Sequence, residues 1–303
     1  MTPAPRPLAL SGRSTIVLLL VSLVGLTMFV WPLFAPAESD LAHSADAPLL
    51  FAAVLTMLVV VVTNEVVSGQ LDAKALAMLG VLAACAAALR PLGSGVSGFQ
   101  PMFIVLILGG RALGPGFGFA LGLVGMFGSA LLTGGVGPWL PFQMLGAAWL
   151  GMGAGLLPRC SGRIEVAMLA GYGAVSGVLY GFLLNMWFWP FLTGADAAIS
   201  FVPGDPLTAN LGRFLAFCLL TSLGFDIPRA IGIIVLIAFV GGPMLRAIRR
   251  ATRKAHFTAQ ARFTDADQDE SGTNGWAAAD ANPASARARS SARRTAGDFV
   301  RRN

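Results

Sequence analysis

Three short segments of the sequence combine aromatic rings with amide side chains, a pattern that suits the binding of a flat organic molecule. They are GSGVSGFQ at 93–100, TGGVGPW at 133–139 and NMWFWP at 185–190. Aromatic rings stack on flat ligands, and amides form neutral hydrogen bonds with them. With their neighbours, these segments give the candidate ligand-binding residues, which are Arg90, Phe99, Gln100, Trp139, Gln143, Asn185 and Trp187.

The third segment has a second interpretation. Tryptophans gather at the lipid–water interface of membrane proteins, and such a belt explains Trp187 and Trp189 equally well. It explains Gln100, Gln143 and Asn185 less well, because an amide buried at membrane depth is costly unless it has a partner. The three amides therefore favour a binding site.

Catalytic and metal-binding patterns do not occur in the sequence. The two histidines, His43 and His256, fall in predicted loops on opposite sides of a membrane, and the three cysteines form no CxxC pair. The acids are singly spaced, and Glu165 and Asp226 lie at predicted helix ends, where we expect solvated caps. A GxxxxGK[ST] phosphate loop is also missing from the sequence. We therefore predict a protein that is not an enzyme, holds no cofactor or metal, and takes the energy for any transport from a partner.

The composition is that of an integral membrane protein. Charged residues make up 12% of the chain and hydrophobic residues 55%, whereas soluble proteins contain about 25% charged residues. Apolar runs lie at 14–34, 49–67, 73–89, 101–110, 113–132, 139–157, 164–184, 209–225 and 227–245. About 20 apolar residues span a bilayer as a helix, so we expect an all-α integral membrane protein. The first run could also be a signal peptide, because APA at 35–37 resembles a cleavage site, but its length favours a retained helix.

Lysine and arginine in the short loops set the orientation in the membrane. Arg6 and Arg13 place the N-terminus inside, and Arg159 and Arg163 mark a second loop inside. The basic block after residue 245 marks a third. We therefore expect a multi-pass protein of the plasma membrane (the inner membrane where there are two), with both termini in the cytoplasm. The three ligand-binding segments then lie on the outer side.

One of the nine apolar runs must fail to cross the membrane, because the basic block after residue 245 would otherwise lie on the outer side. We expect 209–225 to be that run, as a re-entrant or interfacial helix on the outer side. Ten residues at 101–110 would span only about 15 Å as a helix, so we expect a short crossing that is tilted or half-buried.

Small residues recur at every fourth position in several runs, which places them on one helix face. They are Gly114, Gly118 and Gly122; Ala147, Gly151 and Gly155; and Gly173, Gly177 and Gly181. Such faces let helices touch backbone to backbone, so we expect plain helix packing. The run at 73–89 has alanine faces with the same spacing, formed by Ala73/Ala77, Ala83/Ala87 and Ala84/Ala88. Such a face can dock on the same bundle, which spacing alone favours, or on another protein.

The excess of positive charge lies in the last part of the chain. The formal net charge is +6, and the basic residues that produce it follow the last apolar run. This pattern indicates a cytoplasmic membrane anchor rather than a nucleic-acid-binding arm. Residues 255–303 contain almost no large apolar residues, and we expect them to be disordered. The predicted organisation is an N-terminal extension with two helices at 1–71, a membrane core at 72–254 and a basic tail at 255–303.

Residues from about 72 to 250 resemble the substrate-binding S component of energy-coupling factor (ECF) transporters, the prokaryotic vitamin importers. The resemblance rests on the alanine-rich helix ending at Arg90, and on several motifs in a fixed order. These are FQP at 99–101, GGRALGPGFG at 109–118, GPWLPFQM at 137–144, TSLGFDIPRA at 221–230 and GPMLR at 242–246.

This resemblance implies a six-helix bundle with both termini inside. It also implies high-affinity binding of a vitamin near the outer face, and delivery by toppling within the membrane. The implied partners are a transmembrane scaffold subunit, two ATPase subunits and the lipid bilayer, with no nucleic acid. An AxxxA motif of the family contacts the scaffold, which would assign that role to Ala73 and Ala77 or to Ala83 and Ala87.

The GPWLPFQM stretch looks most like the cobalamin-type group of S components, and a large amide-bearing ligand would suit Gln100, Gln143 and Asn185. Riboflavin or another flat heterocycle is the alternative substrate. The chain departs from the family pattern in its N-terminal helices, the run at 209–225 and the long tail. The rival functions are an integral membrane enzyme for lipid-linked substrates and a scaffold or assembly protein.

Overall fold

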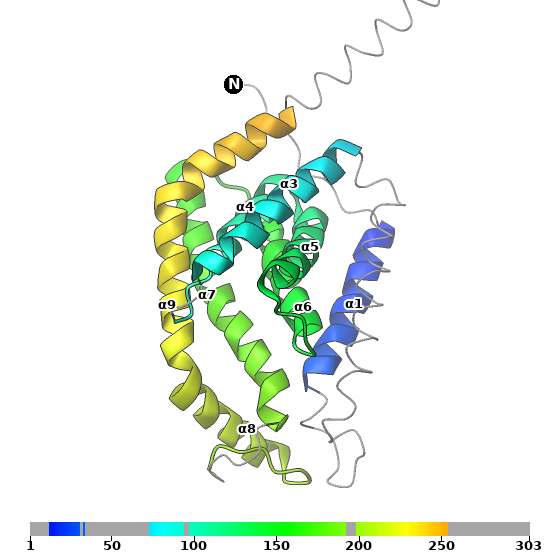
Figure 1. Ribbon diagram of the computed structural model, residues 1–303, viewed down its shortest axis with the longest axis vertical. Coiled ribbons are helices and arrows are strands. Elements are labelled where there is room, and N and C mark those ends of the chain that lie inside the picture. Colours follow the sequence, from blue (N-terminus) through cyan, green and yellow to red (C-terminus); the bar gives the residue numbers. More distant parts are fainter. Residues whose placement is uncertain (1–11, 31–32, 34–72, 94–96, 192–197, 254–303) are drawn as a thin grey trace, which may run out of the picture. The chain divides into compact units, whose positions relative to one another are not determined.

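A computed structural model describes residues 12–30, 33, 73–93, 97–191 and 198–253 (Figure 1). The chain divides into a unit of residues 1–252 and a second unit of residues 253–303, and the helices below belong to the first. The regular elements of the described residues are all helical. The expected all-α membrane fold is therefore confirmed.

The α-helices of the described residues are separated by connections of very different lengths. The helices are α1 Gly12–Val30, α3 Ala73–Leu89, α4 Met102–Leu113, α5 Pro115–Thr133, α6 Leu140–Leu156, α7 Gly162–Phe188, α8 Leu207–Phe217 and α9 Leu223–Leu236, with short helical turns η4 Pro91–Gly93, η5 Trp189–Phe191, η6 Cys218–Ser222 and η7 Ile237–Gly241. Four helical stretches are long and apolar enough to cross a membrane, namely Ala73–Gly93, Pro115–Thr133, Gly162–Phe188 and Leu207–Arg253.

The two ends of this bundle differ in the residues that they carry. The loop end is defined by residues 90–93, 97–101, 133–139, 188–191 and 198–206, which the sequence predicts to face outward. The basic end carries Arg111, Arg159, Arg163 and Arg249.

Helix α4 forms the centre of the bundle rather than a half-buried crossing. Every residue from 101 to 110 is buried, and the helix contacts α3, α5, α6, α7 and α9 (Figure 1). Its 12 residues rise only about 18 Å. A helix enclosed by protein on all sides does not need to reach both lipid surfaces, which explains why so short an apolar segment is stable here.

Helices α5 and α6 touch through their backbones, as the spacing of small residues predicted. A Cβ atom added at Gly118 would collide with the carbonyl group of Gly151, and one added at Gly122 would collide with that of Ala147. Gly155 packs in the same way against Pro115. Backbones that approach this closely gain dispersion contacts that lipid chains cannot replace.

The expected separation of 209–225 from the last crossing is wrong. Residues Leu207–Arg253 form one continuous 47-residue helix, which spans about 70 Å. The π turns η6 and η7 interrupt its regular α-helical bonding, and such turns bend a helix. Figure 1 accordingly shows it as a curved helix that runs from α8 past α9 along α7. Its length and composition are sufficient for it to cross a membrane.

The apolar pattern alone suggested a break near Asp226, and Pro228 strengthens that impression. Proline lacks the N–H that would bond to the carbonyl group four residues earlier, which belongs to Gly224. In the structure the Ser97 hydroxyl donates a hydrogen bond of 2.9 Å to that carbonyl oxygen. A residue from the loop before α4 thus supplies the missing donor, and the helix continues.

Helix α1 matches the first predicted crossing and packs against α6 and α7. The ring centroids of Phe29 and Phe142 lie 5.0 Å apart in an edge-to-face arrangement. The Trp149 indole nitrogen donates to the Ser22 hydroxyl over 2.9 Å. The second predicted helix at 49–67 and the tail at 255–303 lie outside the described residues, so the predicted organisation into three parts stays a prediction.

The backbone contact between α5 and α6 predicts the effect of a single methyl group. We expect Gly151→Ala to lower the free energy of unfolding by about 1–3 kcal/mol, because the new Cβ would overlap backbone atoms that cannot move aside. The measurement is thermal unfolding of the purified protein in detergent.

The control for Gly151→Ala is the same change at Gly171, where an added Cβ meets nothing within 4 Å. Alanine is the better helix former by about 1 kcal/mol, so Gly171→Ala should be neutral or stabilising. Equal melting temperatures for the two variants would contradict this description of the packing.

Candidate functional site

Arg90 and Gln143, which are 53 residues apart in sequence, contact each other inside the loop end of the bundle. Arg90 follows the last residue of α3, and its side chain extends between α5 and α6. Its Nη2 donates to Gln143 Oε1 over 3.0 Å, and its Nη1 donates to Ser129 Oγ over 2.7 Å. Nη1 also lies 2.9 Å from Met126 Sδ. We refer to Arg90, Ser129 and Gln143 as the Arg90 cluster.

The aromatic ring of Trp187 extends the Arg90 cluster toward α7. It packs on Phe142, the neighbour of Gln143, with the ring centroids 5.2 Å apart. Phe142 is buried and also contacts Phe29 of α1. Three of the predicted ligand-binding residues, Arg90, Gln143 and Trp187, are therefore brought to one region by α3, α6 and α7.

Phe99 and Gln100 lie at the start of α4, beside α9. The Phe99 ring occupies the space over Gly232, where a Cβ atom would come within 2.7 Å of the ring. Gly98 has a positive φ of 70° and packs against the backbone of Phe225, so a larger residue would not fit. The Oε1 atom of Gln100 is buried without a hydrogen-bond partner among the described residues.

Asn185 and Trp139 are placed differently from each other. The Asn185 side-chain nitrogen donates to Ser222 Oγ over 2.5 Å and lies 3.5 Å from Cys218 Sγ, which ties α7 to η6. Trp139 is 42% exposed, and its indole nitrogen donates to the carbonyl oxygen of Gly135 in its own loop. The structure therefore does not bring Trp139 to the Arg90 cluster, because its ring lies over Gly137.

A buried ion pair between Asp226 and Arg229 corrects the expected solvated cap at Asp226. The two residues are only 6% and 7% exposed, and their side chains bond to each other. Arg229 also donates to the Gly177 carbonyl oxygen over 3.1 Å and lies 5.7 Å from the centroid of the Tyr180 ring. A Cβ at Gly181 would collide with both charged groups. The glycines of α7 thus make room for an ion pair as well as for helix packing.

Glu165 also proves to be buried rather than a solvated cap. It is 3% exposed and lies at the basic end, between α4 and the last turns of the long helix. Arg111 Nε donates to its Oε1 over 2.6 Å, and Arg249 Nη2 donates to the same oxygen over 2.7 Å. Glu165 therefore holds three helices together at the opposite end from the Arg90 cluster.

Only weak signals in the sequence pointed to the burial of Asp226 and Glu165. Asp226 and Arg229 are three residues apart, which is the spacing of an ion pair on one helix face, and apolar residues flank them. This pattern indicates burial of the pair more strongly than the position of Asp226 at the end of an apolar run indicates a solvated cap. Tyr180, whose ring lies next to the Arg229 guanidinium, had no distinguishing signal in the sequence.

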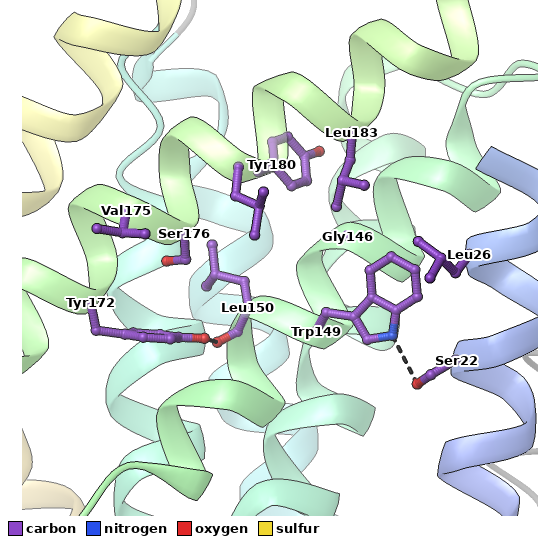
Figure 2. Close-up of a pocket in the computed structure, with 11 residues that line it drawn as sticks. Ser22, Leu26, Gly146, Trp149, Leu150, Tyr172, Val175, Ser176, Tyr180 and Leu183 are labelled. Carbon is purple, nitrogen blue, oxygen red and sulfur yellow. Dashed lines mark hydrogen bonds between the residues drawn. The ribbon is translucent and has the colours of Figure 1, made fainter. Parts of the chain in front are cut away.

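A cavity of about 500 Å³ lies among α1, α6 and α7 (Figure 2). Its walls are mostly apolar and aromatic, and comprise Ser22, Leu26, Gly146, Trp149, Leu150, Tyr172, Val175, Ser176, Leu179, Tyr180 and Leu183. The Tyr172 hydroxyl donates to the Leu150 carbonyl oxygen over 2.7 Å, as Figure 2 shows. Arg90, Ser129 and Gln143 are not among the lining residues, and Gly146 faces Tyr180 of α7.

A second cavity of about 560 Å³ lies at the basic end, and its lining includes Arg163, Glu165, Arg246 and Arg249. Groups of three or more His, Cys, Asp or Glu side chains that could hold a metal do not occur among the described residues. The polar groups of the first cavity are instead hydroxyls of serine and tyrosine and the Trp149 indole, which suit hydrogen bonding to an organic molecule.

The alanine pairs of α3 face two directions. Ala83 and Ala87 are buried against α5, with Ala87 facing Gly128. Ala73 and Ala77 are exposed. Ala84 and Ala88 are exposed as well, so the pairs Ala73/Ala77 and Ala84/Ala88 are accessible to a partner subunit and Ala83/Ala87 is not.

The comparison with known families decides the assignment. Residues 74–241 match the model of the ECF transporter, substrate-specific component. The chain belongs to this family. The matched range covers more than half of the chain and runs from α3 to the end of η7, so α1 lies outside it.

The comparisons with curated proteins and with solved structures found no match. Membership of the family makes the protein a substrate-specific subunit of an ECF importer in a multi-pass membrane fold. S components are transporter subunits rather than enzymes. The helices from α3 through the long helix correspond to the six-helix bundle of this family.

The buried ion pair of this S component gives a stability prediction. We expect Asp226→Asn to destabilise the protein by about 3–5 kcal/mol, because it leaves the buried Arg229 guanidinium without its counter-charge. Thermal unfolding in detergent measures the loss.

The matched control for this prediction is Asp205→Asn. Asp205 pairs with Arg213 over 2.7 Å, but these side chains are 36% and 25% exposed. An exposed pair contributes about 0–1 kcal/mol. If the two asparagine variants melted at the same temperature, the Asp226–Arg229 pair would not have the role assigned to it.

Proposed function

We propose that this S component binds a vitamin with high affinity at the loop end of its bundle and delivers it across the membrane within an ATP-driven importer. The contact between Arg90 and Gln143 carries the proposal. Two polar residues from distant helices meet at membrane depth, where polar side chains are costly and are usually functional. The surrounding rings of Trp187 and Phe142 offer the flat surface that a heterocycle requires.

Unsatisfied polar atoms in the same half of the bundle support a ligand site there. Gln100 Oε1 and Arg229 Nε are buried without a partner among the described residues. A buried polar atom without a hydrogen bond costs about 1–3 kcal/mol, and folded proteins rarely contain one. A ligand with its own donors and acceptors would satisfy these atoms.

The substrate is proposed to be a vitamin with a heterocyclic group. The GPWLPFQM stretch at 137–144 and the three amides Gln100, Gln143 and Asn185 support cobalamin. The cavity of about 500 Å³ supports a smaller heterocycle such as riboflavin, because it lies within the range of about 300–1,000 Å³ that is usual for small-molecule sites. Cobalamin would require the helices or loops at this end to move apart.

The proposed partners are the ECF scaffold subunit and two ATPase subunits. The sequence has no GxxxxGK[ST] phosphate loop, so the energy of ATP hydrolysis must come from other chains. We propose that the exposed pair Ala73 and Ala77 contacts the scaffold. We also propose that both termini are cytoplasmic, because basic residues concentrate at the end of the bundle where Arg159, Arg163 and Arg249 lie.

Gln143→Leu tests the binding site. We expect affinity for the vitamin to fall about 10- to 100-fold, because the change removes a hydrogen bond to a charged group and leaves Arg90 misplaced. The measurement is equilibrium binding of cobalamin and of riboflavin to the purified protein, together with the amount of any small molecule that co-purifies.

The control for Gln143→Leu is Thr27→Val, at an exposed position of α1 where the hydroxyl donates to the Leu23 carbonyl oxygen of its own helix. Thr27→Val should bind as the original protein does. An unchanged affinity in Gln143→Leu would show that this residue does not take part in binding.

Ala77→Leu tests the partner interface. A large side chain on the exposed face of α3 should prevent close approach of a scaffold helix, and we expect the amount of co-purified scaffold subunit to fall at least about tenfold. Ligand binding and melting temperature should not change. Ala167→Leu, an exposed alanine of α7, is the matched control. Full assembly with Ala77→Leu would refute the proposed contact.

A further inference from the structure

Every carboxylate of the described residues forms an ion pair with an arginine other than Arg90. Glu165 pairs with Arg111 and Arg249, Asp205 pairs with Arg213, and Asp226 pairs with Arg229. These three are the acids among the described residues. Arg90 therefore takes part in no ion pair within the part of the chain that the structure describes.

The neighbours of the Arg90 guanidinium are neutral. Its bonds go to the Ser129 hydroxyl, the Met126 sulfur and the Gln143 amide oxygen. Arg90 is partly buried, and it belongs to the apolar span Ala73–Gly93. A guanidinium removed from water without a counter-charge is costly, whereas the other buried arginines, Arg111 and Arg229, each have a carboxylate.

The surroundings of Arg90 show what could provide the missing charge. Its partners Ser129, Met126 and Gln143 offer only neutral acceptors. A ligand with an anionic group at the loop end would supply the charge that these neutral partners lack. Arginine binds carboxylates and phosphates through two parallel N–H···O bonds, which neutral partners cannot match in strength.

We infer that the ligand of this S component carries an anionic group, a carboxylate or a phosphate, which Arg90 binds as its counter-charge. This inference rests on the proposed function and narrows it. Gln143 and Ser129 hold the guanidinium in position through its Nη atoms. Neutral vitamins would leave the charge of Arg90 uncompensated and should bind more weakly than anionic ones of the same shape.

The experiment compares pairs of probes that differ mainly in charge. Biotin is paired with biotinamide, pantothenate with panthenol, and riboflavin phosphate with riboflavin. Binding of each probe to the full-length protein in detergent is measured by calorimetry and by the shift in melting temperature. At least one anionic probe should bind about tenfold more tightly than its neutral counterpart, and whether it carries a carboxylate or a phosphate shows which group the site accepts.

Variants of Arg90 identify the group responsible. Arg90→Gln should abolish the preference for the anionic probe and weaken its binding at least about tenfold, while the neutral probe changes little. Arg90→Lys keeps the positive charge but lacks the two parallel N–H donors. Its preference for the anionic probe should lie between those of the original protein and of Arg90→Gln. The control Arg213→Gln affects an arginine that is already paired with Asp205, and it should leave both probes unchanged.

Two results would overturn the inference and leave the proposed function intact. One is equal binding of the anionic and neutral members of a pair by the unmodified protein. The other is an Arg90→Gln protein that weakens both members equally, which would make Arg90 a purely structural link between helices. The first result is decisive even if Arg90→Gln fails to fold.

A different result would bear on the proposed function itself. If no probe binds, the small molecule released from the denatured protein is identified by mass spectrometry. A released anion would support the inference. A released neutral molecule would overturn the inference and leave the proposed function intact. A protein that binds no probe and releases no small molecule would contradict the proposed function, and the inference with it.

Discussion

Lipid supplies no hydrogen bonds, so each polar or charged group at membrane depth must find its partner within the protein. The described part of the chain follows this constraint closely. Glu165 lies between two arginines, Asp226 pairs with Arg229, and Ser97 bonds to the carbonyl group that Pro228 leaves without a helical partner. Two buried atoms of the described residues, Gln100 Oε1 and Arg229 Nε, have no hydrogen-bond partner, and Arg90 has only neutral ones.

The spacing of glycines on α5, α6 and α7 makes the contacts among these polar groups possible. Contact of α5 with α6 through Gly118 and Gly151 brings Ser129 and Gln143 close enough for Arg90 to bond to both. The glycines of α7 leave space for the Asp226–Arg229 pair beside Tyr180. Short helix α4, enclosed by the others, fixes the loop end by presenting Phe99 and Gln100 there. Helix packing and the geometry of the Arg90 cluster therefore depend on the same small residues.

Much of this architecture could be predicted from sequence because lipid imposes strong local patterns. Apolar runs predicted the described helices, and the four-residue spacing predicted the α5–α6 contact. Proximity of Arg90 and Gln143 followed from both being assigned to the same side of the membrane.

Other features depend on contacts that no local pattern reveals. The apolar run at 209–225 continues into the next because Ser97, far away in sequence, compensates for Pro228. Glu165 and Asp226 resemble solvated caps until arginines from other helices or turns are placed beside them. Trp139 resembles a ligand-binding ring, but its loop folds back under it through Gly137. In each case a long-range or loop-specific contact outweighs the local signal.

The central claim is that the loop end of the bundle, around Arg90 and Gln143, is where this S component holds its substrate. The most direct test is an experimental structure of the protein purified from cells grown in rich medium, with whatever small molecule it carries. The account predicts a single organic molecule in contact with Arg90 and Gln143. A molecule bound instead in the cavity at the basic end, beside Arg163 and Arg246, would contradict it.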